Sequence, residues 1–334
     1  MGRFKQATRK RSQADRRRLT EPDAVAARAI ASAFIPAQAR ASERASAAKL
    51  LIPWQRAPSG VQPGSSVDLD DKGFPAAVSD FIGTETLVLH HSLFPAMSAA
   101  ENLTTVAHLI DQWEPTGKMR TISIITLCRS ALESASRAVW VLCEPDRDER
   151  RSRALRITRE EVQRHKKYVT EQVNRLDKAA ANSASAPMAF ETPAYVIELK
   201  TQKRNAESVM QTLIDSGVKG ALTMEQTIDA AAEWIDANRL VKSGRPMANL
   251  TREKYSIASG IAHGSTWPTR YLLGATDLTS VVADLLYASL TTTEAAITLW
   301  ETHASVDPRV GRKCPQHLRQ AARQLHPRYA SASS

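Results

Sequence analysis

The chain has 334 residues, of which 43% are apolar and 5% aromatic, so it can bury a core in one large domain or two small ones. No window holds about 18 uninterrupted apolar residues, and the basic N-terminus lacks an apolar h-region. We therefore expect no membrane association through a span and no secretory signal. Three cysteines without a paired spacing predict a reducing, cytoplasmic environment.

The positive charge lies at the two ends of the chain. Of the net charge of +10, residues 1–18 carry +7 and residues 309–334 carry +6, which leaves −3 for residues 19–308. Basic tails can bind nucleic acid through phosphate contacts, or they can be solvated, disordered ends. Both interpretations stay open, and both predict disordered basic tails, over 1–18 and over 305–334.

Between the tails, the composition predicts an all-α fold. Long runs rich in Ala, Leu, Glu, Arg and Gln favour helix over strand. Residues 57–73 are rich in Pro, Gly, Ser and Asp, which is typical of a linker. We therefore divide the body into a helical arm and linker over 19–73, with helices ending near residues 35 and 52, and a helical bundle domain over 74–304.

The first helices of the bundle are predicted by capping signals and by apolar content. Ser98 to Glu101 reads as a capping box that opens a helix running to Trp113. The next helix, over 118–143, is the most apolar of the chain and is apolar on more than one side. That pattern is typical of a central helix.

A long antiparallel helical hairpin follows the central helix. Residues 146–182 form one charged helix in which four apolar side chains recur every seven residues: Leu155, Val162, Val169 and Leu176. Residues 194–216 carry a matching stripe of Val196, Leu199, Ala206, Met210 and Leu213. Because such a narrow seam buries little surface, we expect the hairpin to lean on the bundle or to form a homodimer with a second copy.

Three further helices complete the predicted bundle. Thr223 to Gln226 is a capping box that opens a helix ending near Ala237, and the last long helix covers about 277–303. Between them, residues 249–267 place Arg252, Ser256, Ser259 and His263 on one polar face. Gly264 and Pro268 end this helix.

Standard signatures of chemistry are absent from the sequence. It contains no GxGxxG, GxxxxGK[ST], GxSxG or HExxH motif and no paired-cysteine spacing. The sequence therefore predicts no cofactor and no metal site.

Arg129 and Glu133 lie four residues apart on the most apolar helix, so both can be partly buried and within reach of each other. One interpretation is a cation held in a cleft as a phosphate clamp. The other is a core ion pair, since buried charges are normally paired.

Tyr255, Ser259 and His263 are spaced by four residues on the later helix. His263 near a helix C-terminus suits a general acid or an anion-binding cation, or else a histidine that caps carbonyl groups. We predict that His263, Ser259 and Tyr255 face Arg129 and Glu133 across a helix–helix contact, because stranded polar groups on buried helices need partners.

The two patterns together resemble the HEPN-type all-helical bundle proteins of defence, toxin and nucleotide-handling systems. The resemblance rests on Arg129-x-x-x-Glu133 and on Tyr255-x-x-x-Ser259-x-x-x-His263-Gly264, within about residues 96–303. It implies a helical bundle and a nucleic acid or nucleotide as partner, with His263, Arg129 and Glu133 as catalytic residues and Tyr255, Ser259 and Arg252 as binding residues. HEPN ribonucleases carry Arg, about four to six residues, then His, whereas here Arg252 precedes His263 by eleven residues.

Two functions follow from the sequence. The first is a non-catalytic helical interaction or regulatory protein that associates with nucleic acid through its basic tails. The alternative is a HEPN-like ribonuclease or nucleotide-handling enzyme of a phage-defence or toxin type. The absence of the Arg–His spacing at the late helix favours the first function.

Overall fold

The computed structural model describes residues 37–116, 118–181, 193–238, 240, 245–272, 275–307 and 313–330. Every regular element in these ranges is a helix, which confirms the predicted all-α fold. The basic segment 1–18 and the helix predicted to end near residue 35 lie outside them. Among the described helices, none has the length and apolar content needed to span a membrane.

The helices follow one another along the chain with short connections. In order they are α3 (Ala37–Lys49), α4 (Ile52–Arg56), α5 (Ser66–Asp70), α6 (Ala76–Ile82), α7 (Leu87–Asp111), α8 (Trp113–Thr116), α9 (Thr121–Leu142), α10 (Arg147–Ala181), α11 (Pro193–Asp215), α12 (Met224–Ala237), α13 (Met247–Ala262), the 3-10 turn η1 (Trp267–Tyr271), α14 (Ala275–His303), the 3-10 turn η2 (Gln316–Leu318) and α15 (Arg319–Ala330).

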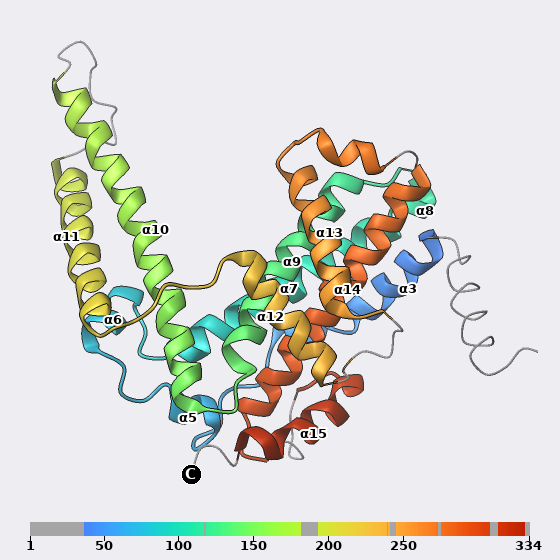
Figure 1. Cartoon of the computed structure of the whole chain (residues 1–334), viewed down its shortest axis with the longest axis horizontal. Helices are drawn as coiled ribbons and strands as arrows, with labels where there is room; N and C mark the ends of the chain where they lie inside the picture. Colours follow the sequence, from blue (N-terminus) through green and yellow to red (C-terminus); the bar gives the residue numbers. More distant parts are fainter. Residues whose placement is uncertain are drawn as a thin grey trace, which may run out of the picture.

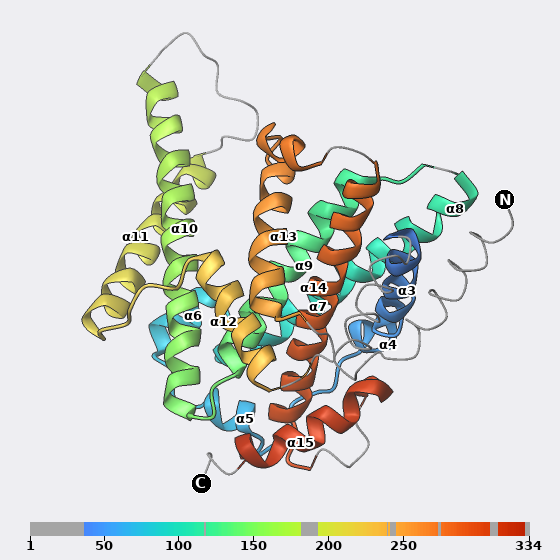
Figure 2. The same cartoon turned by 45° about the vertical axis from the view of Figure 1, so that its right-hand side comes forward.

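The bundle is built around α9, the helix predicted to be central. It packs against α7, α12, α13 and α14, and Figures 1 and 2 show α7, α9, α13 and α14 running side by side. Ile124, Ile125, Leu132 and Val139 of α9 are fully buried. A helix that is apolar on several sides can satisfy that composition only by having neighbours on several sides, and α9 has them.

The predicted hairpin is confirmed. Helices α10 and α11 lie against each other and project away from the bundle (Figure 1). Val169, Val173, Leu176 and Leu199 form a small apolar cluster in the outer part of the hairpin, separate from the main core. Val162 is fully buried and belongs to the main core, so the inner part of the hairpin leans on the bundle as expected.

The start of α7 differs from the prediction, whereas the start of α12 agrees with it. Ser98 lies inside α7, which begins at Leu87 and continues through Pro95. The Asp71 carboxylate caps α7 by accepting hydrogen bonds from the Val88 N–H (2.7 Å) and the Leu89 N–H (3.3 Å), a cap that comes from outside the helix. At α12 the capping box between Thr223 and Gln226 is present in both directions.

The segment predicted as an arm and linker shares the main core. Ala41, Ala45 and Ala48 of α3 are buried against α7 and α14. Their small side chains let the helices approach closely. Trp54 is fully buried and donates from Nε1 to Glu301 Oε1 (2.8 Å), so the chain after α3 is bound to α14.

The linker also contains a buried ion pair. Asp70, at the end of the five-residue helix α5, accepts from Arg150 Nε (2.6 Å) and Nη2 (2.9 Å) of α10. Both side chains are fully buried. The predicted boundary at 57–73 therefore does not separate two cores.

The expectation of an unstructured C-terminal tail is wrong for residues 316–330, which form η2 and α15. Tyr329 is fully buried; its hydroxyl donates to the Cys143 carbonyl (3.0 Å) and accepts from Trp234 Nε1 (3.2 Å). Its ring also packs on His303, with the ring centroids 4.7 Å apart. The positive charge suggested a solvated tail, but the apolar side chains between the arginines fill a site on α14.

Candidate functional site

Helices α9 and α13 bring three of the predicted site residues together. Arg129 Nη2 lies 2.7 Å from Glu133 Oε1, an ion pair within α9. Tyr255 of α13 donates from its hydroxyl to the same Glu133 Oε1 (2.8 Å). The Arg129 guanidinium lies 5.5 Å from the centroid of the Tyr255 ring. The predicted contact between the two helices is therefore made by Arg129, Glu133 and Tyr255.

Burial and charge set the protonation state of this cluster. Burial raises the pKa of Tyr255 to about 12, and the neighbouring Glu133 carboxylate raises it further while Arg129 lowers it. At neutral pH the phenol therefore keeps its proton and donates to Glu133. A tyrosine held in this state is a positioned hydrogen-bond donor and not a general base.

A cavity of about 460 Å³ opens beside the cluster. It is bounded by α7, α9, α10 and α13 and by the start of α12, and its lining includes charged side chains from α9 and α10 together with apolar ones from α7 and α12. The residues are Phe94, Pro95, Ser98, Arg129, Glu133, Ser134, Arg137, Glu161, Arg164, Met224 and Tyr255. This arrangement has the mixture of apolar wall and few polar groups that small-molecule sites show.

The cations around the cavity differ in how fully they are paired. Arg137 and Arg164 both pair with Glu160, at 3.3 Å and 2.5 Å. Arg129 pairs with Glu133 through Nη2, but its Nε is buried and has no hydrogen-bond partner among the described residues. A buried donor without a partner is uncommon in folded proteins.

The other three predicted residues lie away from this cavity. Arg252 is exposed and forms a two-point pair with Asp229 of α12, with Nη2 2.8 Å from Oδ2 and Nε 3.3 Å from Oδ1. Ser259 is half-buried, one turn beyond Tyr255. His263 is exposed and lies eight residues beyond Tyr255, roughly 12 Å further along the helix axis at about 1.5 Å per residue. The predicted pairing of His263 with Arg129 and Glu133 does not appear among the contacts of the described residues.

The end of α13 explains where His263 points. His263 is the C-cap, Gly264 adopts a left-handed φ of +68°, and the Ser265 N–H donates to the Gly260 carbonyl (2.9 Å). The Gly264 N–H donates to the Ile261 carbonyl (3.0 Å), which completes a Schellman motif. This motif ends the helix at the predicted glycine, and it leaves His263 on the solvent side.

The sequence interpretation missed Arg137, Arg164 and Phe94. A signal for Arg137 was present, because Arg129, Glu133 and Arg137 follow one another at steps of four residues on α9. No local signal places Arg164 or Phe94 at the cavity, since they come from α10 and α7.

Comparison with known proteins returns no matching family model, no matching curated protein and no matching solved structure. The assignment of function therefore rests on the chemistry of the residues described above.

Proposed function

We propose that this chain is a non-catalytic helical interaction or regulatory protein. The observation that carries the proposal is the separation of His263 from Arg129 and Glu133. The one predicted group that can exchange a proton near neutral pH lies exposed at the end of α13, while Tyr255 and Glu133 are hydrogen-bonded to each other. An acid–base step needs its groups within hydrogen-bond reach of one substrate, and this separation does not supply that.

Nucleic acid is the partner that the charge distribution favours. The segment from residue 309 to the end holds six Lys and Arg and no acid, and residues 1–18 carry a net charge of +7. Helix α15 turns part of the C-terminal charge into a fixed array, with Arg319, Arg323 and Arg328 exposed beside its buried face. Such an array can contact phosphates without reading the sequence of bases.

Fluorescence anisotropy with single-stranded RNA and duplex DNA at several salt concentrations tests this partner. Deletion of residues 1–18 and Arg323→Gln should each weaken binding and reduce the salt dependence, by a slope of about 0.9 for each lost phosphate contact. Arg204→Gln, which removes an exposed arginine from α11, is the control and should leave both quantities unchanged. Equal binding by the deletion, Arg323→Gln and the full chain would refute the proposed partner.

The same samples test the absence of catalysis. The RNA should remain intact during prolonged incubation with the full chain. Cleavage that is lost in His263→Ala and retained in Arg252→Ala would overturn the non-catalytic proposal and support the ribonuclease alternative.

A specific observation favours a second candidate function, the binding of a nucleotide in the 460 Å³ cavity. The buried Arg129 Nε without a partner, together with the aromatic Phe94 at the same wall, supports a site for a phosphate-bearing ligand with an aromatic base. Calorimetric titration with ATP and GTP tests it. Arg129→Lys should abolish the binding heat, whereas Arg252→Lys should not. An unchanged heat in Arg129→Lys, or none in the full chain, would remove this candidate.

The hairpin is the surface through which we propose self-association. Tyr168 of α10 and Ile197 of α11 are exposed at 54% and 65%, although the seam between the two helices is already filled. Light scattering coupled to size-exclusion chromatography should give a dimer that Ile197→Asp converts to a monomer. A monomeric full chain at high concentration would contradict this.

A further inference from the structure

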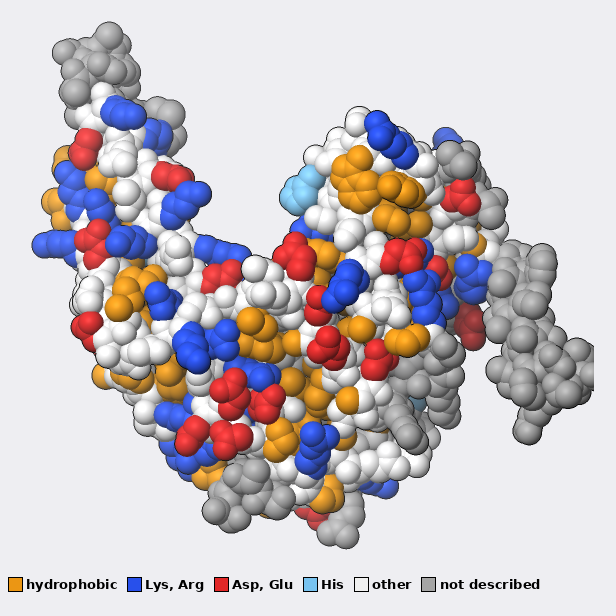
Figure 3. All heavy atoms as spheres, in the orientation of Figure 1, with side chains coloured by type: hydrophobic (Ala, Val, Ile, Leu, Met, Phe, Trp, Pro, Cys, Tyr) orange, Lys and Arg blue, Asp and Glu red, His pale blue; other side chains and the backbone are white. Residues whose placement is uncertain are grey.

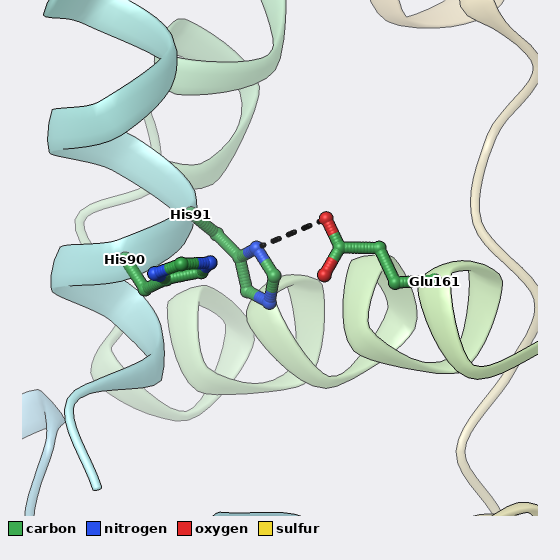
Figure 4. A group of neighbouring side chains, drawn as sticks. All are labelled: His90, His91 and Glu161. Atoms are coloured by element: carbon green, nitrogen blue, oxygen red, sulfur yellow. Dashed lines mark ion pairs between the residues drawn. The ribbon is translucent and has the colours of Figure 1, made fainter. Parts of the chain in front are cut away.

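Two consecutive histidines of α7 meet a glutamate of α10 near the base of the hairpin. One ligand atom from each of His90, His91 and Glu161 lies within 4.8 Å of the other two. Figure 4 shows the His91 ring between the His90 ring and the Glu161 carboxylate. Imidazole nitrogen and carboxylate oxygen are the atoms with which proteins bind zinc and related ions.

The hydrogen bonds around His91 define its tautomer. His91 Nε2 lies 2.8 Å from Thr158 Oγ1, and Thr158 Oγ1 lies 3.1 Å from the Ala154 carbonyl oxygen. The carbonyl can only accept, so the single hydroxyl proton of Thr158 goes to Ala154. Both contacts are satisfied together only when His91 donates from Nε2. The other ring nitrogen, Nδ1, then carries a lone pair.

That lone pair faces a second acceptor. His91 Nδ1 and Glu161 Oε1 are 3.9 Å apart, and the His91 side chain is only 3% exposed. A buried imidazole is disfavoured in its charged form, so no proton is supplied from the histidine side. The nearby cations Arg137 and Arg164 are paired with Glu160. Two acceptors that face each other across this gap are stabilised by a cation placed between them.

We propose that His90, His91 and Glu161 form a binding site for a divalent transition-metal ion, with Zn²⁺ as the type ion. Ligand atoms about 2.1 Å from one ion can be at most about 4.2 Å apart, so the 3.9 Å separation of His91 Nδ1 and Glu161 Oε1 already fits. His90 is half-buried and the Glu161 side chain is 37% exposed, so these two can rotate by the small amount that closes the site. Thr158 is the outer partner that holds the His91 tautomer, as such partners do at zinc sites.

The site has room for a further ligand. His90 and Glu161 line a cavity of about 740 Å³ between α6, α7, α10 and α11, which also exposes Asp80 and His165. Three protein ligands with an open fourth position are typical of zinc sites that exchange a bound water. The ion would also join α7 to α10 at the point where the hairpin leaves the bundle. This proposal does not depend on the proposed nucleic-acid partner.

The test uses the full chain prepared without a histidine tag. Zn²⁺ affinity and stoichiometry are measured by competition with a chromogenic chelator, and Co²⁺ is titrated by its visible absorption, which reports the coordination geometry. Glu161→Gln and His90→Gln remove ligands, and Thr158→Val removes only the outer hydrogen bond. His165→Gln is the matched control, because it changes a histidine of the same cavity outside the cluster. Circular dichroism confirms that each variant is folded.

We expect one Zn²⁺ per chain, with affinity lowered about 10–100-fold in Thr158→Val and further in Glu161→Gln and His90→Gln. The Tm of the full chain should rise with Zn²⁺, and the Tm of Glu161→Gln should not. The control should match the full chain in all readings. Absence of saturable binding, or equal affinity in Glu161→Gln, His90→Gln and His165→Gln, would overturn the proposal and leave a proton shared between His91 and Glu161 as the explanation.

Discussion

Removal of the Asp70 carboxylate is the sharpest test of how the chain before the bundle is held. Asp70 and Arg150 are both fully buried, and two hydrogen bonds of 2.6 Å and 2.9 Å join them. Arg150 Nη1 also donates to the carbonyl oxygens of Glu144 (2.9 Å) and Pro145 (2.6 Å). In Asp70→Ala the guanidinium keeps these two carbonyls but loses the only negative charge bonded to its Nε and Nη2.

The expected loss is about 3–5 kcal/mol in the free energy of unfolding, the range for a buried ion pair from which one partner is removed. At roughly 2 °C for each kcal/mol in a chain of this size, the Tm should fall by about 6–10 °C. Urea denaturation followed by circular dichroism measures the first quantity, and calorimetry measures the second.

Asp68→Ala provides the control on the same helix. The Asp68 side chain is 29% exposed and bonds to the Gly64 N–H (2.8 Å) and to Lys72 Nζ (3.0 Å). Its loss should stay near or below about 1 kcal/mol, as for exposed ion pairs. The double change Asp70→Ala with Arg150→Met should recover stability relative to Asp70→Ala, because no unpaired charge is left. If Asp70→Ala is no less stable than Asp68→Ala, the reasoning about this buried pair is wrong.

Three further predictions test the hairpin, the end of α13 and the cap of α7. Val162 is fully buried, so Val162→Asp should cost on the order of 3–5 kcal/mol in urea denaturation, while the exposed Gln163→Asp should change little; equal midpoints would contradict the heptad seam. A Cβ at Gly260 would lie 2.7 Å from Pro268 Cγ and 2.8 Å from Trp267 Cζ2, so Gly260→Ala should lower stability by about 1–3 kcal/mol, and an unchanged Tm would show that η1 packs elsewhere. Burial raises the pKa of Asp71 to about 7, and its neighbour Asp70 raises it further, against the Val88 and Leu89 N–H groups and Arg151, which lower it. The native state then binds more protons than the unfolded chain between about pH 4 and 7, so the free energy of unfolding should fall as pH rises through this range. Asp71→Asn should flatten that fall, and an identical slope in the variant would show that another group is responsible.

Much of the helical architecture could be predicted because helix formation and amphipathic pairing are local in sequence. The seven-residue spacing of Val162, Val169 and Leu176 predicts the face of α10 that α11 covers, and the apolar content of residues 118–143 predicts a central helix. The four-residue step from Arg129 to Glu133 predicts their ion pair for the same reason.

Part of the candidate site could also be anticipated from the need of buried polar groups for partners. That need correctly predicts that Tyr255 meets Glu133, although the two residues are 122 positions apart. It does not predict the direction of His263, which depends on the left-handed Gly264 and the Schellman motif that turns the chain at the end of α13.

The amino-acid sequence by itself determined the all-α class, the position of the hairpin and central helix, and the pairing of Arg129 with Glu133, because each depends on residues within a few helical turns. Only the tertiary structure decided that Asp70 neutralises Arg150 and that Tyr329 anchors α15 against α14 and the carbonyl of Cys143. It also decided that His90 and His91 face Glu161, about 70 residues later in the chain. These contacts join segments far apart in sequence, and their energies come from desolvation and charge pairing that exist only after the helices have packed.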